Sequence, residues 1–291
     1  MTDAYAYYPG CSLHATGKEF HQSTLAVFSA LGATLHELED WNCCGASSAH
    51  AVNPELTLAL PARNLAIAQR SAHKDLMMPC AACFNRHRAA ELALRNDAAQ
   101  RARLEQLVDF TYEDRVSVRT LLDVVYHDIG LSRVQAKVKR PLEGLRVVQY
   151  YGCLLVRPPA VNNFDDMEHP TVMGRILAAL GAEVKPYAYT TECCGGALSL
   201  TVPKSAARMV DRLVGYARES GAEAMAVSCP LCQINLEMRQ SEQPGQAKMP
   251  IFYITELMGL AFDLPEVDKW WGLHLIDPRP ILHALGTRVA V

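Results

Sequence analysis

Two copies of one cysteine pattern account for all ten cysteines of this 291-residue chain. The first copy contains Cys11, Cys43, Cys44, Cys80 and Cys83, and the second contains Cys153, Cys193, Cys194, Cys229 and Cys232. The spacings are C-x31-CC-x35-CxxC and C-x39-CC-x34-CxxC, and a glycine follows each Cys-Cys pair. Because the same five thiols recur in the same order, each half is predicted to gather five sulfurs around a metal cluster.

The bulk composition is typical of a soluble globular protein. Half of the residues are apolar, 20% are charged and the net charge is −3, which does not favour nucleic acid or an anionic membrane surface as a partner. The first residues show no basic segment followed by an apolar one, and no apolar run approaches the length of a membrane span. We therefore expect a cytoplasmic protein with reduced thiols, in which adjacent cysteines are also poor disulfide partners for each other.

The repeat extends to the elements between the cysteines. Each half shows a β-prone segment ending at Gly-Cys, a helix ending in Ala-Leu-Gly-Ala, a short strand before Cys-Cys-Gly, a helix beginning near a proline, and a strand leading into CxxC. The predicted ranges are 4–9, 18–31, 34–38, 54–70 and 75–78 in the first half, and 145–151, 169–180, 183–187, 203–219 and 224–227 in the second. A further helix follows each CxxC, and segments 118–122 and 253–257 then correspond.

Strands that alternate with helices predict an α/β fold, here as two pseudo-symmetric parallel α/β domains. The polar, basic segment 132–144 suggests a linker, which gives domains 1–140 and 141–291. The cysteines are expected at the carboxyl ends of strands, where open α/β sheets gather ligands and where helix N-termini stabilise negative charge. Five sulfurs exceed the four that zinc or an ordinary four-iron cubane binds.

The motifs resemble the cysteine-rich CCG domain, and their tandem arrangement resembles the B-type subunit of heterodisulfide reductase. The residues that carry this resemblance are Tyr8-Pro9-Gly10-Cys11-Ser12, Asn42-Cys43-Cys44-Gly45, Tyr151-Gly152-Cys153-Leu154, Glu192-Cys193-Cys194-Gly195 and Cys229-Pro230-Leu231-Cys232-Gln233. The resemblance implies that each five-cysteine set ligates one non-cubane [4Fe-4S] cluster, made of fused three-iron and two-iron parts.

The resemblance also implies a thiol–disulfide chemistry. A disulfide between the two clusters would be cleaved with one electron from each cluster, and the reverse reaction would join or oxidise thiols. The sequence contains no ferredoxin-type cysteine run and no Gly-x-Gly-x-x-Gly motif. A ferredoxin-like iron–sulfur subunit and a flavin-containing subunit are therefore the expected partners, with a disulfide or thiol as the substrate.

Other interpretations remain open. A non-catalytic module could relay electrons through cubane clusters, with zinc in the second half as a further alternative. Related CCG subunits of lactate- or glycolate-oxidising complexes end soon after the second CxxC, whereas 59 residues follow Cys232 here. Within the heterodisulfide reductase type, the substrate could be a methanogen heterodisulfide or a lipoate-bound sulfur compound.

Four other residues are weaker candidates for a role at the site. His14, His50 and His87 lie near cluster cysteines and could donate protons to departing thiolates. Arg157 could pair with a substrate carboxylate or phosphate, although a surface salt bridge is the simpler interpretation. The apolar tail 265–291, which includes Trp270 and Trp271, could pack on its own domain or contact a partner subunit.

Overall fold

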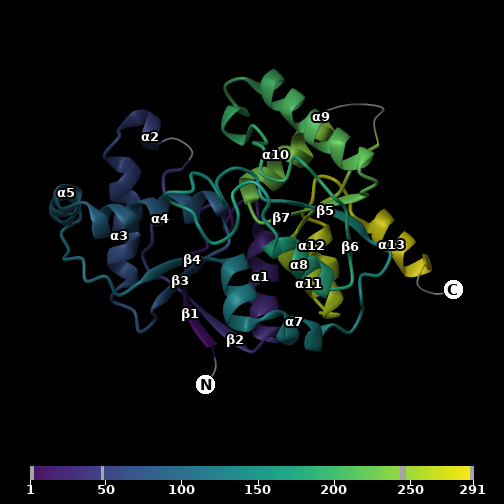
Figure 1. Ribbon diagram of the computed structural model, residues 1–291, viewed down its shortest axis with the longest axis horizontal. Helices are drawn as coiled ribbons and strands as arrows, with labels where there is room; N and C mark the ends of the chain where they lie inside the picture. Colours follow the sequence, from purple (N-terminus) through teal and green to yellow (C-terminus); the bar gives the residue numbers. More distant parts are fainter. Residues whose placement is uncertain (1–2, 47–48, 243–246, 289–291) are drawn as a thin grey trace.

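The computed structural model describes residues 3–46, 49–242 and 247–288, which form two four-stranded parallel sheets (Figure 1). The first sheet has the order β2-β1-β3-β4 and contains β1 (Asp3–Tyr7), β2 (Ala33–Glu37), β3 (Asp75–Met78) and β4 (Ser117–Thr120). The second has the order β6-β5-β7-β8 and contains β5 (Arg146–Tyr150), β6 (Glu183–Val184), β7 (Ala224–Val227) and β8 (Ile251–Tyr253). The matching strand orders confirm the predicted pseudo-symmetric α/β fold, while the boundary at residue 140 stays a prediction.

Helices connect the strands of each sheet. The first half contains α1 (Lys18–Ala30), α2 (Ala49–Val52), α3 (Leu56–Ala68), α4 (Ala81–Asn96), α5 (Ala98–Val108), α6 (Leu121–Asp123), a π-helical turn η1 (Val124–Ile129) and α7 (Leu131–Lys137). The second contains α8 (Val172–Ala179), a 3₁₀ turn η2 (Gly196–Leu198), α9 (Pro203–Glu219), α10 (Pro230–Ser241), α11 (Ile254–Ala261), α12 (Val267–Trp271) and α13 (Arg279–Arg288). Parallel neighbouring strands require such crossovers, which also cover the sheet faces.

Two predicted elements of the second half are shorter than expected. The strand predicted over 183–187 ends at Val184, because Pro186 has no backbone N–H for a ladder hydrogen bond. The helix predicted over 169–180 begins at Val172, where the carboxylate of Asp165 accepts hydrogen bonds from the amides of Thr171 and Val172. Both differences follow from local backbone hydrogen bonding, and neither changes the order of elements.

The two halves pack tightly against each other through α1, α11 and α12. The ring of Phe20 stacks on Tyr253 with 4.1 Å between centroids, and the hydroxyl of Ser23 lies 2.6 Å from that of Thr255. Trp270 in the C-terminal tail is 1% exposed. The α12 part of the tail therefore packs against α1 of the first half as well as α11 of the second, and not on its own domain alone.

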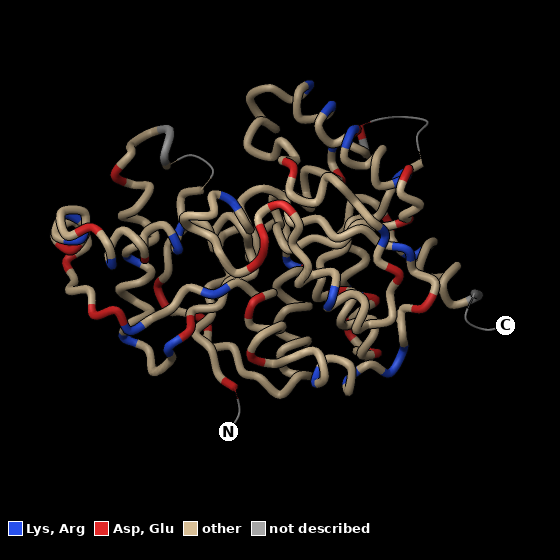
Figure 2. Tube along the Cα trace, in the orientation of Figure 1, with Lys and Arg blue, Asp and Glu red and all other residues tan. Residues whose placement is uncertain are grey.

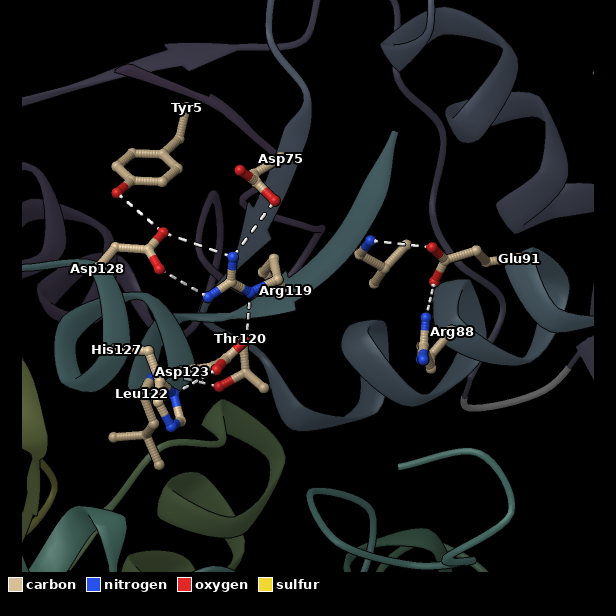
Figure 3. A network of polar contacts seen from close by, with 11 residues as sticks. Tyr5, Asp75, Arg88, Glu91, Arg119, Thr120, Leu122, Asp123, His127 and Asp128 are labelled. Carbon is tan, nitrogen blue, oxygen red and sulfur yellow. Dashed lines mark hydrogen bonds and ion pairs between the residues drawn. The ribbon is translucent and has the colours of Figure 1, made fainter. Parts of the chain in front are cut away.

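An arginine at the edge strand of the first sheet joins several elements (Figure 3). The guanidinium of Arg119 in β4 pairs with Asp75 in β3, Asp123 in α6 and Asp128 in η1. Tyr5 in β1 donates to Asp128 at 3.2 Å. Elsewhere, Lys and Arg are interspersed with Asp and Glu along the described chain (Figure 2). The network therefore fixes α6 and η1, which follow β4, to the first sheet.

Candidate metal centre

The cysteines lie where the strands of both sheets end. Cys11 and Cys153 follow the central strands β1 and β5, and Cys80 and Cys229 follow β3 and β7. The Cys-Cys-Gly turns come from the loops after β2 and β6. Because neighbouring parallel strands end at the same edge of a sheet, the order of elements brings each five-cysteine set together.

Short sulfur–sulfur contacts connect the thiols of the first half. The Sγ atoms of Cys11 and Cys43 lie 3.5 Å apart, as do those of Cys44 and Cys83. The thiols of Cys43 and Cys44 contact each other, and so do those of Cys80 and Cys83. All five thiols of the first copy therefore form one continuous group.

The second half repeats this arrangement and contacts the first. The Sγ atoms of Cys194 and Cys232 are 3.5 Å apart, and Cys153 donates a hydrogen bond to Cys193. Cys229 contacts Cys232 within its own half and Cys80 across the interface. The two sites thus meet at one sulfur pair, and the hydroxyl of Ser228 donates to the carbonyl of Pro79 beside it at 3.3 Å.

A glycine before each lone cysteine leaves space for the sulfurs. Gly10 has φ +75° and Gly152 has φ +64°, which favour glycine. A Cβ at Gly10 would lie 2.8 Å from Sγ of Cys83, and one at Gly152 would lie 3.0 Å from Sγ of Cys232. Both positions therefore need glycine for the backbone conformation and for the thiol that approaches it.

Buried asparagines hold the Cys-Cys-Gly turns in place. In the first half, the amide of Asn64 donates to the carbonyl of Asn42 at 2.9 Å and accepts from its N–H at 3.0 Å. In the second half, the amide of Asn235 donates to the carbonyl of Cys194 at 2.7 Å. Neither asparagine belongs to the cysteine motifs that predicted the site, although an asparagine within an apolar helical segment is a signal of such a role.

Tyrosines repeat at equivalent positions and bind the same part of each turn. The hydroxyl of Tyr8 donates to the carbonyl of Asn42 at 2.8 Å, and that of Tyr150 donates to the carbonyl of Glu192 at 2.7 Å. Both acceptors directly precede a Cys-Cys pair. The turns are thus fixed by hydrogen bonds that remain when the sulfurs are bound to something else.

The thiol of the first cysteine in each Cys-Cys pair has a lowered pKa. Hydrogen bonds from Cys11, from the adjacent thiol and from the glycine amide of the turn lower the pKa of Cys43 to about 2. A hydrogen bond from Cys153, with a further one from the glycine amide, lowers the pKa of Cys193 to about 6. Thiolates are the metal-binding form of cysteine, so each turn holds one sulfur ready for a cation.

The two CxxC pairs face each other at helix N-termini. Cys80 is the N-cap of α4 and Cys229 is the N-cap of α10. Hydrogen bonds from Cys232 and Cys80 lower the pKa of Cys229, while its contact with Cys229 raises the pKa of Cys80. The positive ends of two helix dipoles therefore meet where the sulfur groups touch, which favours negative charge there.

The predicted histidines are placed differently from one another. His87 is fully buried, with Nδ1 2.8 Å from the carbonyl of Cys83 and Nε2 3.1 Å from the amide nitrogen of Asn64. Burial lowers the pKa of His87 to about 4, so the ring is neutral and both nitrogens have partners. His14 is partly exposed and lies 3.0 Å from Glu37. The side chain of His50 lies outside the described residues.

Arg157 lies beside the second Cys-Cys-Gly turn. Its guanidinium donates to the hydroxyl of Thr191 at 3.1 Å, and its carbonyl accepts from the amide of Asn85 in the first half at 3.0 Å. The side chain is half-buried in the second half. Arg157 therefore lies next to the second turn, with its backbone in contact with the first half.

Fold and site together define a tandem cysteine-rich α/β protein with two adjoining five-thiol centres. The chain belongs to the CCG cysteine-rich domain family, which matches residues 5–86 and 147–237.

Three relatives are similar over most of their length. A protein of Wolinella succinogenes, the 8-methylmenaquinol:fumarate reductase membrane anchor subunit, is 31% identical and the match covers 95% of this chain and 98% of the relative. A protein of Archaeoglobus profundus that is named as like the B-type subunit of heterodisulfide reductase is 28% identical, with 94% and 95% covered. The B-type subunit of a CoB-CoM heterodisulfide reductase of Methanosarcina acetivorans is 24% identical, with 87% of both chains covered. The second and third relatives confirm the resemblance to the B-type subunit of heterodisulfide reductases.

A solved structure of a hypothetical protein from Helicobacter pylori shares the fold. Its TM-score is 0.71 at 11% identity, and the match covers 94% of this chain but 52% of that one, so this chain spans about half of it. Among the described residues, no helix combines the length and the apolar character needed to cross a membrane. The family and the fold together support an iron–sulfur redox subunit.

Proposed function

We propose that this chain is the catalytic iron–sulfur subunit of a heterodisulfide-reductase-like complex, which reduces or forms disulfides through two non-cubane [4Fe-4S] clusters. Cys11, Cys43, Cys44, Cys80 and Cys83 would ligate one cluster, and Cys153, Cys193, Cys194, Cys229 and Cys232 the other. The complex would work in the cytoplasm, where thiols are kept reduced.

The contact between Cys80 and Cys229 carries this proposal. These two buried thiols interact across the interface between the halves, so a cluster bound by one set would lie next to a cluster bound by the other. Two five-thiol groups at separate ends of the molecule would suit independent relay centres, whereas groups that adjoin suit a reaction that needs both.

The donor set fits iron–sulfur clusters. Each site offers five thiols, and few charged side chains lie beside them in the sequence. The segments without Asp, Glu, Lys or Arg are 8–17, 41–46, 79–85, 151–156, 193–203 and 228–236. Gly10 and Gly152 leave open the space that a Cβ would occupy beside a cysteine sulfur. Sulfur ligands without competing carboxylates are the set that iron–sulfur clusters require.

Partner subunits would supply the electrons that the overall reaction consumes. Reduction of one disulfide to two thiols consumes two electrons and two protons, and the bound clusters would supply one electron each. A ferredoxin-like iron–sulfur subunit and a flavin-containing subunit would deliver the electrons in sequence. Arg157 would hold an anionic group of the substrate, because its guanidinium lies beside the second turn.

The test is the stoichiometry of disulfide turnover. Anaerobically purified protein, reduced with a chemical donor, is mixed with coenzyme M–coenzyme B heterodisulfide or with a lipoyl disulfide, and the thiols are counted. We expect two thiols per two electrons consumed, and an EPR signal of the oxidised protein that appears when one of the thiols is added. Electron consumption without thiol formation for any disulfide would contradict the proposal.

A second candidate function is a non-catalytic electron relay. The observation that favours it is the 31% identity to a subunit of a methylmenaquinol:fumarate reductase, which is named as a membrane anchor. In this case the clusters would pass electrons between other subunits without binding a disulfide. Oxidation of the reduced protein by a menaquinone analogue, together with no thiol-dependent EPR signal, would favour the relay.

A further inference from the structure

A group of nitrogen and oxygen ligands lies beside the first cysteine site. His14 is in the loop after Cys11, His21 is in α1, and Glu37 ends β2. One ligand atom from each of the three lies within 4.8 Å of the other two, and Nε2 of His14 is 3.0 Å from Oε1 of Glu37. We propose that this triad, the His14–His21–Glu37 site, binds one Zn²⁺ ion separately from the ten cysteines.

The ligand chemistry suits zinc. Zinc binds imidazole nitrogen and carboxylate oxygen at about 2.0–2.2 Å, and three protein ligands leave a fourth position for water. His14 and Glu37 have side chains that are 46% and 37% exposed, so an ion and its water can reach the site. Burial lowers the pKa of His21, which keeps its ring in the neutral, metal-binding form.

The hydrogen bonds around the triad hold the ligands in position. The indole N–H of Trp41 donates to Oε1 of Glu37 at 3.0 Å. The phenol oxygen of Tyr7 lies 3.0 Å from Nδ1 of His21, and when Nδ1 donates to this oxygen, Nε2 retains the lone pair for a metal. Metal sites commonly orient their ligands through such outer hydrogen bonds.

The fold itself does not require these three residues. The corresponding positions of the second half, counted from the lone cysteine and from the Ala-Leu-Gly-Ala segment, hold Val156, Pro170 and Pro186. The second half builds the same sheet and the same cysteine turn with these apolar residues. The triad is therefore an addition to one half of a repeated fold.

A bound ion would connect the loop of Cys11 to α1 and β2. Zinc would take the place of the hydrogen bond between Nε2 of His14 and Oε1 of Glu37, which are 3.0 Å apart. The bound ion would then occupy the Nε2 atom of His14, so this histidine, a proton-donor candidate from the sequence, would not donate a proton from that atom. The site would thus stabilise the lone-cysteine loop of the first half. This role is independent of the type of cluster and of the reaction that the cysteines support.

Zinc binding to the cluster-loaded protein tests the proposal. Anaerobically purified protein is given one equivalent of Zn²⁺ and desalted, then zinc and iron are counted and the zinc X-ray absorption spectrum is recorded. We expect one retained zinc with unchanged iron and only nitrogen or oxygen ligands near 2.0–2.1 Å, without the sulfur distance of about 2.3 Å. The double variant H14A/H21A should lose this zinc, and W41F should bind it about 10–100-fold more weakly.

A matched control removes two other histidines. His36 and His73 stack with 4.5 Å between ring centroids and lie outside the triad, so H36A/H73A should retain the zinc. E37Q keeps the shape of the site and removes the negative charge of Glu37. This variant tests the site even if the double variant H14A/H21A does not fold. The proposal is overturned if the protein retains no zinc, if the zinc has sulfur ligands, or if E37Q and W41F bind zinc as tightly as the unmodified chain.

Discussion

Substitution of Gly10 by alanine tests the first cysteine site through a single added methyl group. The added Cβ would lie 2.8 Å from Sγ of Cys83, while ordinary contacts begin at 3.4 Å. The thiol must therefore move by about 0.6 Å, which exceeds the tolerance of about 0.2 Å for metal–ligand distances. Alanine at φ +75° also costs about 1–2 kcal/mol of folding free energy.

The two effects can be separated by a control glycine. Gly221 has φ +81°, but a Cβ there would meet only the end of the Lys185 side chain, with Cε at 3.5 Å and Nζ at 3.9 Å. In urea unfolding of the metal-free protein, both G10A and G221A should lose about 1–2 kcal/mol because of the positive φ, and G10A should lose more because its Cβ also displaces Cys83. Only G10A should lose iron, from about eight to about four atoms per chain.

The companion variant G152A acts on the other set. Its Cβ would lie 3.0 Å from Sγ of Cys232, so it should release iron from the second site and leave the first site loaded. Full iron content in G10A, or an equal loss of iron in G221A, would refute the account of the glycine positions.

Two further predictions concern buried polar side chains. The ring of His274 is fully buried and lies 2.8 Å from Glu237 and 2.9 Å from Glu256. Burial opposes the charged ring, but the attraction of Glu256 and hydrogen bonds to both carboxylates raise the pKa of His274 to about 11. The free energy of unfolding of H274Q should be about 3–5 kcal/mol lower than that of the unmodified chain at pH 6 or below. Because the pKa of histidine in the unfolded chain is about 6.5, this difference should shrink as the pH rises from about 6.5 towards 11. A difference in urea unfolding that does not depend on pH would contradict this prediction. N64A removes the partner of the Asn42 N–H and leaves the Asn42 carbonyl bonded to the Tyr8 hydroxyl alone, which should cost about 1–3 kcal/mol and speed iron loss to a chelator. An unchanged rate of iron loss would contradict the role of Asn64.

The sequence predicted the order of elements well because both halves carry the same local signals. Each Ala-Leu-Gly-Ala segment ends a helix, and both glycines have positive φ, 73° at Gly32 and 90° at Gly181. The placement of cysteines after strands also follows from local signals. Pro186 could have corrected the strand predicted over 183–187, since proline cannot donate a ladder hydrogen bond.

The relation between the two sites could not be predicted from local patterns. The contact of Cys80 with Cys229 depends on how the halves pack, and no spacing within either half encodes it. The His14–His21–Glu37 site likewise joins a loop, a helix and a strand. The position of Asn64 in an apolar helical segment signals a buried polar role, but its partners are a backbone carbonyl and N–H, which no side-chain pattern identifies. Such contacts between distant elements become visible only when the fold is built.

The central claim is that each half binds one iron–sulfur cluster through its five cysteines. The most direct measurement is the content of iron, acid-labile sulfide and zinc per chain after anaerobic purification, with the zinc ligands identified by X-ray absorption. The account predicts about eight irons and no sulfur-bound zinc. About four irons with one sulfur-bound zinc would contradict it, because one half would then hold a structural zinc site in place of a cluster.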